Sequence, residues 1–191
     1  DNELAYIANS AEQMGLNRVA IAAHEARLSR GPAVVAASED LFRLCRLEQA
    51  RDPQFPGLLR QYPAMQARHS AVPEDQSIAS YYYYASALLE RNLPQAQAGL
   101  IEMRQKLPDR NELLITLALT HLRLGATPEA SRLIEENPVD IASVPMRMKP
   151  AMIYVLGKTG QNELARSLAQ KLDLAQYFLE ERELVTPWTQ R

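Results

Sequence analysis

Three histidines are the residues of this chain whose type most readily supports metal or acid–base chemistry. His24, His69 and His121 are separated by 45 and 52 residues, whereas metal sites need ligands that cluster. Leu28 stands where a zinc-binding HExxH motif starting at His24-Glu25 would need its second histidine. The spacing therefore favours histidines packed on helix faces over a metal or acid–base site.

The other candidate catalytic groups also have simpler structural interpretations. Cys45 lies among Leu41 and Leu44, which predicts a small buried hydrophobic residue rather than a nucleophile. The acidic groups Glu135-Glu136 and Glu180-Glu181-Glu183 are predicted to lie on solvated helix faces, since acid–base pairs must converge across a cleft. The sequence has no glycine-rich phosphate loop. We therefore expect a non-enzyme without a cofactor or metal.

Four consecutive tyrosines, residues 81–84, are the most unusual local feature. On a helix they point in four directions about 100° apart, so at least one should be buried and at least one should face a groove or solvent. We expect two or three of them to pack between helices. A remaining tyrosine would offer a partner a large contact area and a hydroxyl group.

Composition limits the classes of partner. The 191 residues are 47% hydrophobic and include 21 Lys and Arg against 23 Asp and Glu, a formal charge of −2. This balance argues against a nucleic-acid binder that works by bulk positive charge. No apolar run reaches the roughly 18 residues of a membrane-spanning helix. A single cysteine suits cytoplasm and periplasm alike, so we expect a soluble protein of either compartment.

The elements that would position these residues are helices. Ala, Leu, Glu, Gln and Arg are strong helix formers, and apolar residues recur three and four apart. Proline, glycine and asparagine interrupt the pattern at short intervals. The sequence predicts an all-α fold with antiparallel helices near 2–14, 17–30, 34–51, 56–69, 76–91, 94–106, 111–124, 128–136, 147–159, 162–171 and 174–184, with an extended connection over 137–146 and a loop over 70–76.

Alanine recurs near the start of the second helix of successive hairpins. Ala20, Ala96, Ala130 and Ala165 are 76, 34 and 35 residues apart, and 76 is two steps of 38. Further residues of this pattern are Ala8, Gly15 and Pro32 in the first hairpin and Ala118 and Gly125 in the fourth. The pattern resembles the tetratricopeptide repeat family, whose unit is about 34 residues long. The units would be 1–34, 39–76, 77–110, 111–144 and 146–179, in one domain, with a capping helix at 174–184. Tyr84 stands where the family has a small residue.

The resemblance implies a right-handed superhelical stack of helix hairpins that binds a partner in a concave groove. The family's groove is lined by the first helix of each hairpin. Carried across, this selects Asn9, Arg43, Tyr81, Ile115, Arg123, Arg147, Tyr154 and Lys158 as the best binding candidates, with Asn2, Gln13, Leu47, Arg51, Ile78, Ala85 and Leu119 as further lining residues. Several are basic, which favours an acidic partner. The full set that chaperone-binding relatives use to hold a C-terminal carboxylate is absent.

Three functions remain open from the sequence. The first is a scaffold that binds a protein or peptide segment. The second is a docking arm of a larger bacterial envelope, polysaccharide-export or cell-wall machine, because the chain starts at Asp1 on the first position of a unit, which predicts further repeats before it. In that case Tyr81 and Tyr154 could stack on sugar rings. The third is an all-helical enzyme with a dispersed site.

Overall fold

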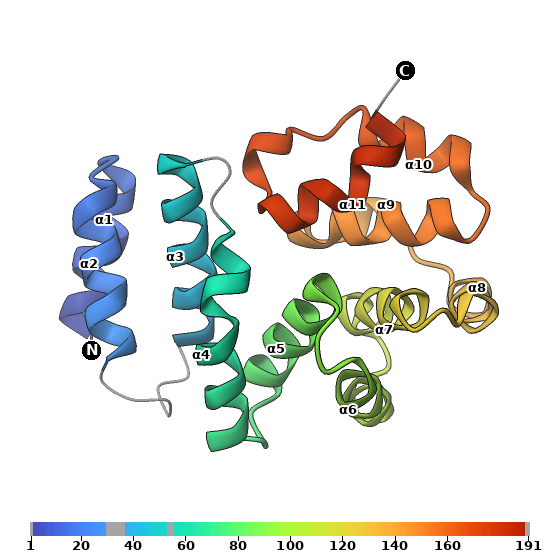
Figure 1. Cartoon of the computed structure of the whole chain (residues 1–191), viewed down its shortest axis with the longest axis horizontal. Helices are drawn as coiled ribbons and strands as arrows, with labels where there is room; N and C mark the ends of the chain where they lie inside the picture. The colour runs from blue at the N-terminus through green and yellow to red at the C-terminus, as the bar shows by residue number, and fades with distance from the viewer. Residues whose placement is uncertain (1, 30–36, 53–55, 190–191) are drawn as a thin grey trace. The chain divides into compact units, whose positions relative to one another are not determined.

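The computed structural model describes residues 2–29, 37–52 and 56–189, and all regular structure in these ranges is helical (Figure 1). The prediction of an all-α protein is confirmed for this part of the chain. The α-helices are α1 (Asn2–Gln13), α2 (Asn17–Leu28), α3 (Ala37–Arg51), α4 (Gly57–Ala71), α5 (Gln76–Leu89), α6 (Leu93–Lys106), α7 (Asn111–Arg123), α8 (Thr127–Glu136), α9 (Lys149–Lys158), α10 (Asn162–Ala169) and α11 (Leu179–Thr189).

Two predicted segments differ from the structure. The connection over 137–146 is not simply extended, since it contains the 3₁₀ turn η1 (Ile141–Ser143) and the start of a second, η2 (Met146–Met148). The helix predicted over 174–184 is wrong at both ends. A 3₁₀ turn, η3 (Leu174–Gln176), comes first, and α11 begins only at Leu179 and continues to Thr189. The signature position at Pro32 lies outside the described residues, as does Pro53, one of the prolines that interrupt the helical pattern.

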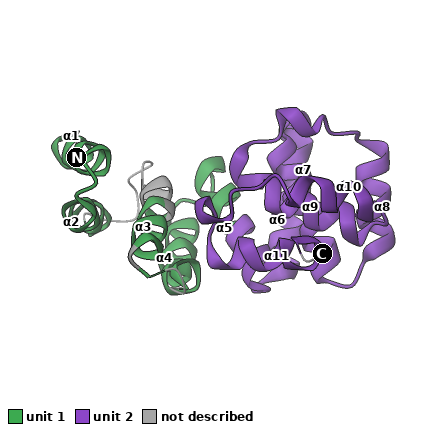
Figure 2. Ribbon diagram, turned by 90° about the horizontal axis from the view of Figure 1, so that it is seen from above, with its two compact units in different colours: residues 1–82 green, residues 83–191 purple. Residues whose placement is uncertain are grey.

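The chain divides into two compact units, Asp1–Tyr82 and Tyr83–Arg191 (Figure 2). Helix α5 crosses the division, so its two ends belong to different units. In the first unit α1 packs on α2, α2 on α3, and α3 on α4. In the second, α7 packs against α6, α8 and α9, while α9 also packs against α10 and α11.

The first helix of a hairpin ends in the same way at four places. The terminating residue has a positive φ in each, 69° at Gly15, 55° at Glu90, 78° at Gly125 and 99° at Gly160. The next residue donates its N–H to the carbonyl five residues earlier, at 2.8 Å from Leu16 to Ala11 and at 2.9 Å from Arg91 to Ser86, Ala126 to His121 and Gln161 to Leu156. This is the Schellman motif, which closes a helix and reverses the chain.

The alanines that begin the second helices lie in the hairpin interfaces. Ala20, Ala96, Ala130 and Ala165 are all 0% exposed. A methyl side chain allows two helix backbones to approach closely, whereas a larger side chain at these positions would overpack the interface. The four recurrent turns and the four buried alanines together mean that the hairpins are built by the same local rules.

The tyrosine run distributes its side chains as predicted. Tyr82, Tyr83 and Tyr84 are buried, at 1%, 7% and 4% exposure, and Tyr81 is half-buried. Tyr82 stacks on Tyr62 with a 5.7 Å centroid separation. Tyr83 packs against Gly99, where an added Cβ would overlap the phenol ring. The run therefore contributes mainly to packing.

His69 is a buried histidine whose protonation should destabilise the first unit. Its ring stacks on Tyr82 at 4.8 Å, and burial lowers the pKa of His69 below 6.5. Because the neutral form is favoured in the folded state, its contribution to stability is present above about pH 6.5 and is lost as the pH falls through the lowered pKa. We expect acidification to lower the urea midpoint less in His69→Phe, which keeps the stacked ring. The midpoint is measured by urea denaturation followed by circular dichroism. If acid lowers it by the same amount in both proteins, the assignment is wrong.

Helix α11 is attached by Glu181, which the sequence placed on a solvated face. Glu181 is only 1% exposed, so that prediction is wrong for this residue. Its Oε2 accepts a hydrogen bond from the Phe178 N–H at 3.0 Å, which starts the helix at Leu179 in the manner of a capping box. Its Oε1 accepts from the Tyr84 hydroxyl at 2.9 Å. The large residue at Tyr84 thus holds α11 onto α5.

Within the described ranges, no helix has both the length and the apolar character needed to cross a membrane.

Candidate functional site

An open pocket of ≈ 520 Å³ lies between α1 and α3 in the first unit. Asn9, Glu12 and Gln13 line it from α1, and Arg43, Arg46 and Leu47 line it from α3. Each helix contributes residues three or four positions apart, which stand on one helix face. Four of the six, Asn9, Gln13, Arg43 and Leu47, are residues that the sequence placed in a binding groove.

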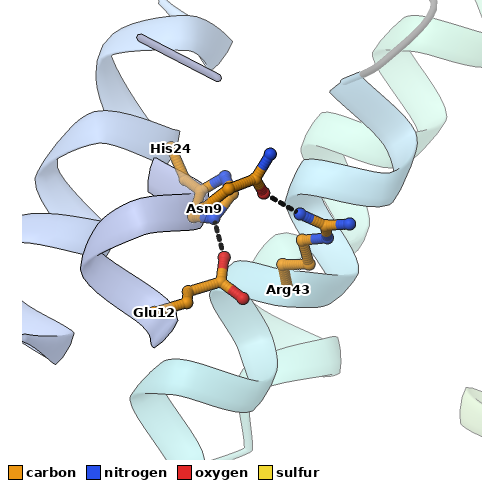
Figure 3. Close-up of polar contacts among 4 residues, drawn as sticks. All are labelled: Asn9, Glu12, His24 and Arg43. Atoms are coloured by element: carbon orange, nitrogen blue, oxygen red, sulfur yellow. Dashed lines mark hydrogen bonds and ion pairs between the residues drawn. The ribbon is translucent and has the colours of Figure 1, made fainter. Parts of the chain in front are cut away.

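Polar contacts hold the walls of this pocket in place (Figure 3). The Arg43 guanidinium donates from Nη1 to the Asn9 side-chain oxygen, which joins α3 to α1. Glu12, on the same helix as Asn9, has its Oε1 2.6 Å from Nε2 of His24, a histidine with no exposed surface. His24 therefore has a structural role, since it positions the Glu12 carboxylate from the neighbouring helix α2.

Amide groups at this pocket are available for a ligand. Asn9 uses its oxygen for Arg43, and its side-chain nitrogen donates to no described residue. Gln13 is exposed, and its side chain forms no hydrogen bond within the part of the chain that the structure describes. Two guanidinium groups and one carboxylate line the walls, so the lining itself carries an excess of positive charge. The pocket can pair with main-chain amides and with an acidic side chain.

A second group of predicted residues gathers around Tyr154 in the other unit. The Arg123 guanidinium lies 5.0 Å from the Tyr154 ring centroid, and Lys158 Nζ lies 5.7 Å from it. Such distances allow cation–π attraction. Trp188 meets the same ring edge-on at 5.9 Å. The structure therefore brings Arg123, Tyr154 and Lys158 together.

Arg123 is less available than the sequence suggested. Its Nη1 forms an ion pair with Glu90 Oε1 at 2.7 Å, and only 19% of the side chain is exposed. It also covers part of the Tyr154 ring, which leaves less of that ring for stacking on a sugar. Arg123 and Tyr154 are thus largely packed, and Lys158 is the exposed member of this cluster.

Other predicted lining residues do not face a ligand. Ile115 is 0% exposed, so its assignment to a binding surface is wrong. The further lining candidates Ile78, Ala85 and Leu119 are likewise buried. Helix α7 shows the reason, because α6, α8 and α9 all pack against it and residues 113–120 are buried without interruption.

Tyr81 and Arg147 lie in neither group of residues. Tyr81 is half-buried on α5. Arg147, in η2, is half-buried as well, and its main-chain oxygen accepts a hydrogen bond from the Tyr84 hydroxyl at 3.1 Å. The side chains of Asn2 and Arg51 lie outside the described residues.

The sequence missed several residues of these sites. Arg46 stands one turn from Arg43 on the same helix face, a signal that helical spacing alone could have supplied. Glu90 and Trp188 meet the Tyr154 cluster from distant parts of the sequence, and no local pattern points to them.

The remaining candidates for chemistry are dispersed. Cys45 is completely buried, which confirms its prediction as a core residue. Among the described residues, no three His, Cys, Asp or Glu side chains come together in a way that could hold a metal ion.

Comparison with known proteins does not assign this chain to a family. No protein-family model matches the sequence, and neither a curated protein nor a solved structure shows significant similarity to it.

Proposed function

We propose that the chain is a tetratricopeptide-like interaction scaffold, and that it binds an extended acidic peptide segment in the pocket between α1 and α3. The observation that carries this proposal is the pocket lining itself. Asn9 and Gln13 from the first predicted unit and Arg43 and Leu47 from the second line one hollow, as the groove assignment requires.

The chemistry of the pocket suits an extended chain. An extended peptide presents unpaired N–H and C=O groups at regular intervals, and Asn9 and Gln13 supply amides that can pair with them. Arg46 is exposed at the pocket and can reach an acidic side chain. Leu47 adds apolar contact for an intervening side chain.

The recurrence of hairpin geometry supports the scaffold part of the proposal. The same closing motif appears at Gly15, Glu90, Gly125 and Gly160, at spacings of 75, 35 and 35 residues. These spacings agree with a repeat of about 34 residues, with one further hairpin between the first two turns. Stacked hairpins expose the first helices of neighbouring units to a common partner.

Fluorescence anisotropy tests the binding. The probe is a fluorescein-labelled peptide of alternating glutamate and leucine, which favours an extended conformation, compared with its lysine–leucine counterpart. We expect the acidic peptide to bind and the basic one to bind far more weakly. In Asn9→Ala/Arg46→Gln, affinity should fall by about tenfold or more, and its dependence on salt should become shallower.

Arg18→Gln is the matched control, because Arg18 is exposed on α2 and does not line the pocket. It removes the same charge and should leave binding unchanged. If the control variant and the pocket variant lose affinity equally, the interaction is a general charge effect and the pocket assignment is wrong. Equal binding of both peptides would contradict the preference for an acidic partner.

A further inference from the structure

A second, smaller pocket of ≈ 130 Å³ lies in the unit formed by residues 83–191. Its apolar lining comes from η1 and the residue after it, from α9, from α10 and from the segment that follows α10. These residues are Ile141, Val144, Met152, Ile153, Leu168 and Leu172. Val144, Met152 and Ile153 are buried and form its interior. None of these residues takes part in the pocket between α1 and α3.

Two lysines complete the lining of this apolar pocket. Lys149, at the start of α9, is half-buried, and Lys171, just after α10, is exposed. Neither forms an ion pair or a hydrogen bond through its side chain with any residue in the described ranges. Two ammonium groups beside an apolar interior are arranged to receive a group that is apolar at one end and negatively charged at the other.

The position of Lys149 strengthens this interpretation. It is the first residue of α9, where the positive end of the helix dipole makes a basic side chain unfavourable. The same dipole adds to the attraction that both lysines exert on an anion.

The size of the pocket limits the apolar part of the ligand. A dry protein cavity of roughly 150 Å³ accommodates a benzene molecule. At ≈ 130 Å³, this pocket can hold a single aromatic ring or a branched aliphatic group of similar size. Inorganic anions would leave the apolar walls unused, and a long acyl chain would exceed the volume.

We propose that this pocket binds a small apolar carboxylate, with one ring or a branched aliphatic group inside and the carboxylate between Lys149 and Lys171. A free organic acid and the C-terminal residue of a peptide share this chemistry. The site is independent of the peptide-binding function proposed above, because no residue is common to the two pockets.

Titration of the whole chain with 3-phenylpropionate tests the proposal, with backbone amide shifts in heteronuclear NMR spectra as the readout. A ligand with so few atoms binds weakly, so the expected Kd is on the order of millimolar. Shifts should be confined to residues 141–153 and 168–172. The neutral analogue 3-phenylpropionamide should bind about tenfold or more weakly. No saturable shifts in these segments, or equal binding of acid and amide, would overturn the proposal.

Variants separate the charged from the apolar contribution. Lys149→Gln/Lys171→Gln should weaken binding of the acid by about tenfold and leave binding of the amide unchanged. Leu168→Trp, which adds bulk at the pocket lining, should weaken both. Arg166→Gln is the control, since Arg166 is exposed on α10 and does not line the pocket. If the lysine variant binds the acid like the control, the lysines do not recognise a carboxylate and the proposal fails.

A pair of capped tripeptides ending in phenylalanine, one with a free C-terminus and one amidated, identifies the source of the carboxylate. Tighter binding of the free-terminus peptide than of 3-phenylpropionate assigns the pocket to a peptide C-terminus. Binding of the small acid alone assigns it to a free organic acid. Both peptides and the small acid can also be titrated into Asn9→Ala/Arg46→Gln, in which the α1–α3 pocket is disabled. Failure of one site is therefore distinguishable from failure of the other.

Discussion

Replacing Glu181 with alanine is expected to lower the free energy of unfolding by about 2–4 kcal/mol, because two buried donors lose their acceptor at once. The Tyr84 hydroxyl and the Phe178 N–H both donate to this carboxylate. Burial raises the pKa of Tyr84 well above its ordinary value, and the charge and hydrogen bond of Glu181 raise it further, so the hydroxyl remains a donor. The Phe178 N–H loses the bond to the Glu181 carboxylate when Glu181 is removed.

Urea denaturation followed by Trp188 fluorescence measures this effect. Trp188 is the only tryptophan of the chain, and it lies on α11, the helix that Glu181 anchors. Glu183→Ala is the control, since Glu183 is exposed on the same helix and its loss should change stability by less than about 0.5 kcal/mol. Equal destabilisation by the two substitutions would show that buried hydrogen bonding by Glu181 is not what stabilises α11.

A double-mutant cycle with Tyr84→Phe isolates the contact between α5 and α11. If the hydroxyl and the carboxylate interact as the 2.9 Å distance indicates, their coupling energy should be about 0.5–3 kcal/mol. Additive effects of Tyr84→Phe and Glu181→Ala would mean that the two groups stabilise the fold separately. The main-chain oxygen of Arg147 remains as an alternative acceptor for Tyr84 and reduces the cost of Glu181→Ala.

Replacing Gly157 with alanine is the second substitution with a large expected effect. The sign of the change in unfolding free energy identifies its cause. Alanine normally stabilises a helix interior relative to glycine by up to about 1 kcal/mol. Here a Cβ would overlap the Trp188 indole, which packs directly on Gly157 of α9. We expect a loss of about 1–3 kcal/mol from overpacking and a red shift of Trp188 emission as the ring is displaced.

The control for Gly157→Ala is the same substitution made in a variant that lacks the indole. Trp188→Leu removes the indole, so the added methyl no longer meets an aromatic ring. In that background Gly157→Ala should be neutral or stabilising in circular dichroism melts, as helix propensity predicts. Destabilisation of the same size in both backgrounds would place the cause elsewhere than in the contact with Trp188.

The sequence by itself determined the local structure of this protein. Helix formers in amphipathic spacing, interrupted by glycine, asparagine and proline, predict helices whose positions agree closely with those observed through α10. The four recurrent alanines identify the close helix contacts, because only a small side chain allows two backbones to approach. The sequence failed at α11, where the helix start depends on Glu181 reaching back to Phe178.

Only the tertiary structure decided which helix faces stay accessible. Between α1 and α3, Asn9 and Arg43 stay accessible and line an open pocket. The groove assignment failed at Ile115, because three neighbouring helices enclose α7. Helical periodicity describes one helix and its own faces, whereas exposure depends on every helix packed against it. Glu181 escaped prediction for that reason, since its partner Tyr84 lies on α5. The role of Lys149 and Lys171 escaped it as well, because the apolar lining beside them comes from several separate elements.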